Sequence, residues 1–251
     1  MLFTHHSHSG QFCTHATSTL KEVTEAAITR GLTSITLTEH IPRDEIDFYP
    51  NESSHPLLAK RSIWQLFADY HAEALRLRTL YSDRIEIFIG FEGEWIRGSR
   101  SAKIIRELQG KYEFDVWIGS VHHVHSIPID YNREVHLSAR EKAGGTDVAL
   151  ARDYFDAQEE MLRTLRPPIV GHFDLIRLLA DEGMRDRDWR TWEEGVWEKI
   201  VRNLEVVREY GGVLEINSAA LRKGLGDVYP RREIMEVSWC GGLLAVARMG
   251  R

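Results

Sequence analysis

Short β-rich runs alternate with helical segments seven times along the 251 residues of this chain. The β-rich runs favour strands, and the segments between them carry apolar residues at helical spacing. No repeat or low-complexity stretch interrupts this order. The pattern predicts a parallel α/β fold in a single domain, residues 1–251. A closed or nearly closed barrel is favoured over a doubly wound open sheet, because the sequence has no glycine-rich phosphate loop.

The expected elements place the polar motifs at strand ends. A first strand leads from the amino terminus into residues 4–10, and later strands are expected at 32–38, 84–90, 114–119, 169–171, 212–216 and 242–247. Helices are expected at 19–30, where Thr19 and Glu22 have capping-box spacing, and at 62–81, 101–112, 148–165, 188–210 and 231–237. Residues 43–60 and 126–147 are expected to be long irregular loops.

The composition is that of an ordinary globular protein, with 43% hydrophobic and 28% charged residues. A net charge of -6 gives no reason to expect nucleic acid or an anionic membrane as a partner. Two cysteines are too few for a disulfide scaffold, and no apolar run approaches the roughly 20 residues of a membrane span. With no secretory signal visible, these features predict a cytoplasmic protein.

The histidine-rich sequence THHSHSG, residues 4–10, follows the first strand. Because strand side chains alternate between faces, His6 and His8 are expected on one side, about 6–7 Å apart. Two imidazoles at that spacing can reach one metal ion, since each metal–nitrogen bond is about 2 Å long. An accidental histidine-rich start is the alternative.

Other metal-binding residue types also lie at or just past predicted strand ends. They are His15, Glu39, His40, Glu92, Glu94, His122 and His172. In α/β barrels the carboxyl ends of the strands meet at the edge where active sites form. Buried imidazoles and carboxylates need partners, and their mixture suits Zn, Mn or Fe. Several ions would lower the pKa of bound water and clamp phosphoryl oxygens, which predicts a hydrolase.

Five ordered motifs resemble the PHP (polymerase and histidinol phosphatase) superfamily. They are HHSHSG with His15, TEH at 38–40, GFE at 90–92, GSVHH at 119–123 and GHFD at 171–174. Their order and spacing are most similar to the monofunctional histidinol-phosphatases of fungi and some bacteria. The segments GFEGEW, SVHHV and LEINSAALRKG strengthen that resemblance.

The resemblance implies a distorted (β/α)7 TIM-like barrel with a trinuclear centre of Mn, Zn or Fe. The implied metal ligands, which are also the implied catalytic residues apart from His15, are His6, His8, His15, His40, Glu92, His122 and His172. It further implies hydrolysis of L-histidinol phosphate, a small phosphate monoester, in histidine biosynthesis. The alternatives are another phosphoesterase of the superfamily, acting on nucleotides or nucleic-acid ends, and a truncated metal-binding product with impaired catalysis.

Some neighbouring residues are given supporting roles. Glu39 is expected to orient His40 or to bind backbone, and Glu94 to stay at the rim. Arg177 and Arg222 are candidates for binding the substrate phosphate, with an ordinary surface position as the alternative. His123 and His125 are possible pocket residues, Asp174 a helix cap, and His5 structural or exposed. His55, His71 and His136 are expected at the surface.

The sequence departs from the family pattern at its end. In the family the last strand runs into a Ser-Asp-x-His type segment, whose Asp and His complete the metal centre. Here LLAV runs into ARMGR, and no Asp or His follows Val237. We therefore expect a chain that lacks the closing segment of the barrel and has reduced activity.

Overall fold

The computed structural model describes residues 2–193, 195–240, 242 and 245–248, and the chain forms two compact units. The amino-terminal unit comprises residues 1–93 and 103–118, and the carboxy-terminal unit comprises residues 94–102 and 119–251. The sequence-based expectation of a single domain stays a prediction.

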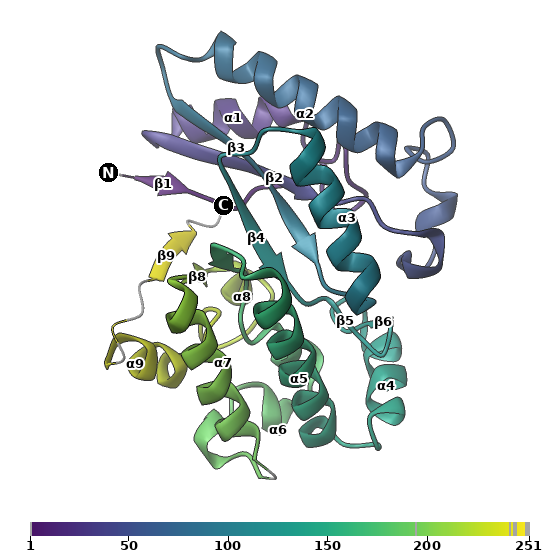
Figure 1. The fold of residues 1–251 in the computed structure, drawn as a ribbon, viewed down its shortest axis with the longest axis vertical. Coiled ribbons are helices and arrows are strands. Elements are labelled where there is room, and N and C mark those ends of the chain that lie inside the picture. Colours follow the sequence, from purple (N-terminus) through teal and green to yellow (C-terminus); the bar gives the residue numbers. More distant parts are fainter. Residues whose placement is uncertain (1, 194, 241, 243–244, 249–251) are drawn as a thin grey trace. The chain divides into compact units, whose positions relative to one another are not determined.

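Parallel strands and covering helices make up the amino-terminal unit (Figure 1). Its elements are β1 (Phe3–Thr4), α1 (Leu20–Thr29), β2 (Ser34–His40), α2 (Ile63–Leu80), β3 (Glu86–Glu94), α3 (Gly98–Lys111) and β4 (Val116–Ser120). The last residues of β3 and β4 and the first residues of α3 belong to the carboxy-terminal unit. The strand order is β1-β2-β3-β4, and β2 runs parallel to both β1 and β3. Helix α2 packs beside α1 and against β2.

Local sequence signals explain these elements. Thr19 caps α1 through the predicted capping box with Glu22. A Cβ atom on Gly90 would lie 2.2 Å from the carbonyl oxygen of Val116, so only glycine fits where β3 approaches β4. Between 43 and 60 the chain forms only two short 3-10 turns, Glu45–Asp47 and Glu52–Ser54, in agreement with the predicted loop.

The carboxy-terminal unit continues the strand–helix alternation. Its elements are β5 (His123–Val124), β6 (Ile127–Pro128), α4 (Arg133–Lys142), α5 (Asp147–Leu165), β7 (Ile169–Val170), α6 (Glu182–Arg185), α7 (Val196–Tyr210), β8 (Val213–Asn217), α8 (Ala219–Arg222), α9 (Arg232–Cys240) and β9 (Ala245–Arg248), with 3-10 turns at Leu175–Leu179 and Trp189–Thr191. Strands β7, β8 and β9 are parallel and adjacent in that order. Helices α5 and α7 run side by side over an apolar core that includes Phe155 and Trp189.

The predicted parallel α/β architecture is confirmed, with local corrections. Residues 126–147 are not irregular, because Asn132 caps α4 by accepting a hydrogen bond from the Val135 N–H. The helix expected over 188–210 begins at Val196. The last strand, expected at 242–247, covers Ala245–Arg248, and residues 243–244 lie outside the described residues. Within the described chain, no helix is both long and apolar enough to cross a membrane.

Candidate metal centre

The loop after β1 is tied to the neighbouring strand β2 by hydrogen bonds from Ser7, the residue between His6 and His8. The Ser7 hydroxyl donates to the Thr36 carbonyl at 2.9 Å, and the Ser7 N–H donates to the Thr38 hydroxyl at 2.9 Å. His6 and His8 therefore lie just past the end of β1, not on the strand itself. These bonds fix the loop so that both rings stand beside the carboxyl end of β2.

Strand register brings the next two predicted ligands together. His40 is the last residue of β2 and pairs in parallel register with Glu92 of β3. The N–H of Ile41 then donates to the Glu92 carbonyl at 3.1 Å, which extends the pairing by one residue. Residues 52 positions apart in sequence thus become neighbours because they occupy equivalent places on adjacent strands.

Three imidazoles converge on a single carboxylate oxygen, and we call His6, His8, His40 and Glu92 the amino-terminal cluster. The Oε2 atom of Glu92 lies 3.1 Å from Nε2 of His6, 3.1 Å from Nε2 of His8 and 3.4 Å from Nδ1 of His40. The Nε2 atoms of His6 and His8 are 2.9 Å apart. Glu92 and His6 are buried.

These distances fit a metal ion. Ligand atoms bound about 2.0–2.1 Å from a tetrahedral ion lie about 3.4 Å from one another, close to the separations in the cluster. Imidazole nitrogens and a carboxylate oxygen are ligands that Zn, Mn and Fe accept. A buried group of this kind needs positive charge, which a divalent ion supplies.

Glu39 is a supporting carboxylate, but its partner differs from the prediction. Its Oε1 atom lies 3.2 Å from Nδ1 of His8, and its Oε2 atom accepts hydrogen bonds from the Ser9 N–H and hydroxyl. Glu39 therefore orients His8 and not His40, and the bond from the Ser9 N–H confirms the alternative that Glu39 binds backbone. Burial alone would lower the pKa of His8, but hydrogen bonds to Glu39 and Glu92 outweigh it and raise the pKa.

His15 lies at the edge of the amino-terminal cluster. Its ring centroid is 5.5 Å from that of His40, and its Nε2 atom is 3.3 Å from the Thr14 hydroxyl. Nearby, the buried guanidinium of Arg43 donates to Glu52 at 2.5 Å. Burial favours the neutral form of Glu52, yet Arg43 outweighs it and lowers the pKa of that carboxyl. His15 is thus held beside a charged pair and faces His40.

Cys13 is a residue of this unit to which the sequence gave no role in the site. It is buried in the same loop and lines a pocket together with His15 and His40. Burial raises the pKa of its thiol well above the ordinary value. The signal that could have drawn attention to it is its position between two predicted ligands, His8 and His15.

A second group of predicted ligands lies within the carboxy-terminal unit. The Nε2 atoms of His122 and His172 are 3.1 Å apart, and Nδ1 of His122 is 3.8 Å from Glu94. Glu94 is buried, so the expectation of a rim position is wrong. The backbone N–H of His172 donates to the buried carboxylate of Glu215 at 2.8 Å. Glu215 was missed, although a glutamate within an apolar strand, LEIN, is a usable signal.

Charged groups surround this histidine pair. Burial would raise the pKa of Asp130, but His122, Lys223, His123 and His172 outweigh it and hold the pKa below its usual range. His123 is buried within β5, and His125 is exposed with its Nε2 atom 2.7 Å from Asp153. The expectation that His123 and His125 line the pocket stays a prediction.

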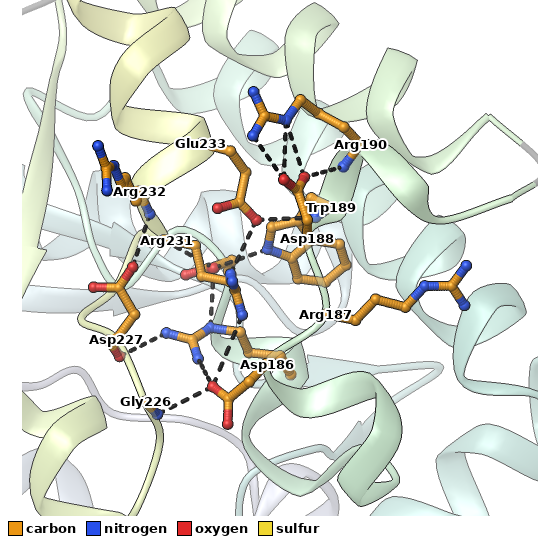
Figure 2. A network of polar contacts seen from close by, with 12 residues as sticks. Asp186, Arg187, Asp188, Trp189, Arg190, Gly226, Asp227, Arg231, Arg232 and Glu233 are labelled. Atoms are coloured by element: carbon orange, nitrogen blue, oxygen red, sulfur yellow. Dashed lines mark hydrogen bonds and ion pairs between the residues drawn. The ribbon is translucent and has the colours of Figure 1, made fainter.

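Figure 2 shows a polar network that includes Trp189, Asp227 and Arg231. Arg177, a predicted phosphate ligand, is fully buried in that network. It donates to Asp174 at 3.1 Å and to the carbonyls of Asp227 and Val228 at 2.9 and 2.7 Å. Asp174 also accepts from the Trp189 indole and the Arg231 N–H, and its side chain does not cap a helix. Arg177 thus has a structural role, and its contact with phosphate stays a prediction.

The remaining residues singled out in the sequence occupy varied positions. Arg222 is exposed at the end of α8, and His55 is half-buried. His71 and His136 are buried, which corrects the expectation of surface positions. Their rings contact the backbone carbonyls of Glu113 and Ile129 at 3.2 and 2.9 Å. His5 is buried, in line with a structural role.

Known proteins are similar to this chain in both sequence and fold. The sequence model of the PHP domain family matches residues 4–219. A probable histidinol-phosphatase of Schizosaccharomyces pombe is 42% identical over 92% of this chain and 74% of its own length. The histidinol-phosphatase of Saccharomyces cerevisiae is 32% identical over 93% of this chain and 77% of its own.

Solved structures extend the comparison to the fold. A putative histidinol phosphatase from Listeria monocytogenes has a TM-score of 0.82 at 20% identity and covers 98% of this chain and 93% of its own. A histidinol phosphate phosphatase from Lactococcus lactis, complexed with zinc, L-histidinol and phosphate, has a TM-score of 0.72 at 18% identity, with 99% and 85% covered. These likenesses confirm the predicted fold class, a distorted TIM-like barrel.

Proposed function

Because the chain belongs to the PHP domain family, we propose that it is a metal-dependent phosphatase that hydrolyses L-histidinol phosphate to L-histidinol and phosphate. The observation that carries the proposal is the convergence of three imidazole nitrogens on one oxygen of Glu92. The curated relatives named histidinol-phosphatase support the choice of substrate. We further propose a role in histidine biosynthesis and a cytoplasmic location.

The proposed metal ligands are His6, His8, His15, His40, Glu92, His122 and His172. This set exceeds one tetrahedral shell, and the family resemblance, in which a further Asp and His complete the centre, implies a trinuclear site. The zinc in the Lactococcus lactis protein supports a divalent metal.

Residues of the chain orient the proposed ligands and are available to bind phosphate. Bound divalent ions would lower the pKa of a water ligand and neutralise charge on the phosphoryl oxygens. Glu39 accepts from Nδ1 of His8, which leaves the Nε2 lone pair directed at the site. Ser9 holds Glu39 in turn, and Glu215 holds the backbone of His172. Arg222 and Arg177 are the proposed partners for phosphate, and Arg222 is the more accessible of the two.

Phosphate release from L-histidinol phosphate tests the proposal. Purified protein is supplied with Mn²⁺ or Zn²⁺ and compared with the Glu92→Gln variant on a panel that includes nucleoside monophosphates. We expect release that depends on Glu92 and is fastest with L-histidinol phosphate. Faster hydrolysis of a nucleotide, or no release from any substrate by metal-loaded protein, would contradict the proposal.

A further inference from the structure

Cys13 stands next to the amino-terminal cluster in a position set by its loop. Its N–H donates to the Ser9 carbonyl at 3.1 Å, and Ser9 is itself bonded to Glu39. The preceding residue, Phe12, is buried against Tyr70 with ring centroids 6.1 Å apart. These contacts hold the side chain of Cys13 towards the histidines instead of leaving it in a mobile loop.

The thiol and two rings form a compact donor group. Sγ of Cys13 and one ring nitrogen each of His8 and His40 lie within 4.8 Å of one another. The two rings are stacked, with centroids 4.2 Å apart and planes 6° from parallel. A buried cysteine in an apolar core is an ordinary packing residue. Here the thiol has a charged neighbour, because the carboxylate of Glu39 acts on it electrostatically.

We propose that Cys13 is a further metal ligand, which together with His8 and His40 gives the centre a sulfur-containing face for a thiophilic divalent ion such as Zn²⁺, Co²⁺ or Cd²⁺. When the ion binds, the S–H bond breaks, a sulfur–metal bond forms and one proton leaves to solvent, with no change of oxidation state. The three ligand atoms would close by roughly 1 Å to reach tetrahedral spacing. The inference rests on the proposed metal centre but not on the substrate.

Sulfur coordination would influence which metal the protein selects. Thiolate ligands favour zinc, whereas Mn²⁺ prefers oxygen ligands and water. A centre made only of imidazole and carboxylate lacks this bias. Cys13 is therefore expected to raise the preference of the protein for Zn²⁺ over Mn²⁺, and the Cys13→Ser variant should lose part of that preference.

Cobalt spectroscopy on the full-length protein tests the inference. Co²⁺ bound to a thiolate gives a charge-transfer band in the near ultraviolet, whereas its visible ligand-field bands arise from any low-symmetry site. We expect both kinds of band in the unmodified protein. The near-ultraviolet band should vanish in Cys13→Ser and persist in Cys240→Ser, the matched control for the other cysteine.

Each other result has a distinct meaning. Visible bands without a charge-transfer band in the unmodified protein would overturn the role of Cys13 and leave the proposed metal centre standing. The absence of both kinds of band would contradict the metal centre itself. Should Cys13→Ser not fold, the ¹¹³Cd resonance of the unmodified protein decides, because thiolate ligation moves it strongly downfield of a site with only nitrogen and oxygen ligands.

Discussion

Two buried polar groups in this protein are built on opposite principles. In the Arg177 network of the carboxy-terminal unit, carboxylates face donors, as Asp174 faces the Arg177 guanidinium and the Trp189 indole. In the amino-terminal cluster, imidazole nitrogens, which are common metal ligands, are arranged around the carboxylate of Glu92. In the first group, guanidinium and indole donors bind the carboxylate. The second presents the kinds of ligand atom that a divalent cation takes, and this contrast separates a structural network from the proposed binding site.

The largest effect is expected from breaking the Arg177 network. Asp174→Ala leaves a buried guanidinium without its carboxylate and should lower the free energy of unfolding by about 3–5 kcal/mol. Denaturant unfolding measures this change. Asp188→Ala is the control, since Asp188 pairs with the exposed Arg190 in the same segment and should shift the midpoint little. Equal shifts in both variants would show that the buried network does not stabilise the unit.

The opposite pattern is expected in the amino-terminal cluster. Glu92→Gln removes the oxygen charge on which three imidazoles converge, and should lower kcat/KM by more than about 100-fold, the upper end of losses for residues that only support ligands. The unfolding free energy of metal-free protein should change less than in Asp174→Ala, because Glu92 faces imidazoles and not a buried guanidinium. A strongly destabilised, active variant would contradict this distinction.

Substitution of Glu39 tests whether a residue that supports a proposed ligand matters for metal binding. Glu39→Gln keeps the shape of the side chain but weakens its hold on His8 and Ser9. Metal affinity should fall by about 10–100-fold, less than for loss of Glu92. Competition with a chromophoric chelator measures it. Unchanged affinity would mean that the orientation of His8 does not depend on Glu39.

Substitution of Asp147 is expected to have the smallest effect on the free energy of unfolding, and the one that depends most on pH. Burial would raise its pKa, but the His136 hydrogen bond, the Asp181 N–H and Arg140 outweigh it and lower the pKa. The stabilisation it contributes is therefore present above the unfolded pKa of about 3.9 and lost as pH falls through the lower folded value. Unfolding of wild type and Asp147→Asn should differ at pH 7 and converge in acid. A difference that grows on acidification would contradict this assignment.

The sequence predicted the features that depend on local pattern and strand order. Periodicity located the parallel strands, and strand-end logic placed His40 beside Glu92, which the register confirms. Helix α4 was missed because Pro128 and the Gly144-Gly145 pair suggested a loop, while Asn132 gave only a weak capping signal. Local pattern can show that a polar residue is unusual, but not which residue contacts it.

Partners of buried polar groups were therefore the main source of error. Glu39 binds His8 instead of His40, and Arg177 is enclosed by segments about 50 residues away along the chain. His136 was expected at the surface, yet it is a buried residue of α4 and its ring contacts the Ile129 carbonyl. Such pairings follow from tertiary structure alone.

The central claim is that the amino-terminal cluster holds divalent metal. Measuring metal content after equilibrium dialysis tests this claim most directly. The wild-type protein and Glu92→Gln are dialysed against the same buffered Zn²⁺ solution and measured by elemental mass spectrometry. The account predicts that wild type retains bound zinc and that Glu92→Gln retains at least one equivalent less. Equal zinc content in both proteins, or none in the wild type, would contradict it.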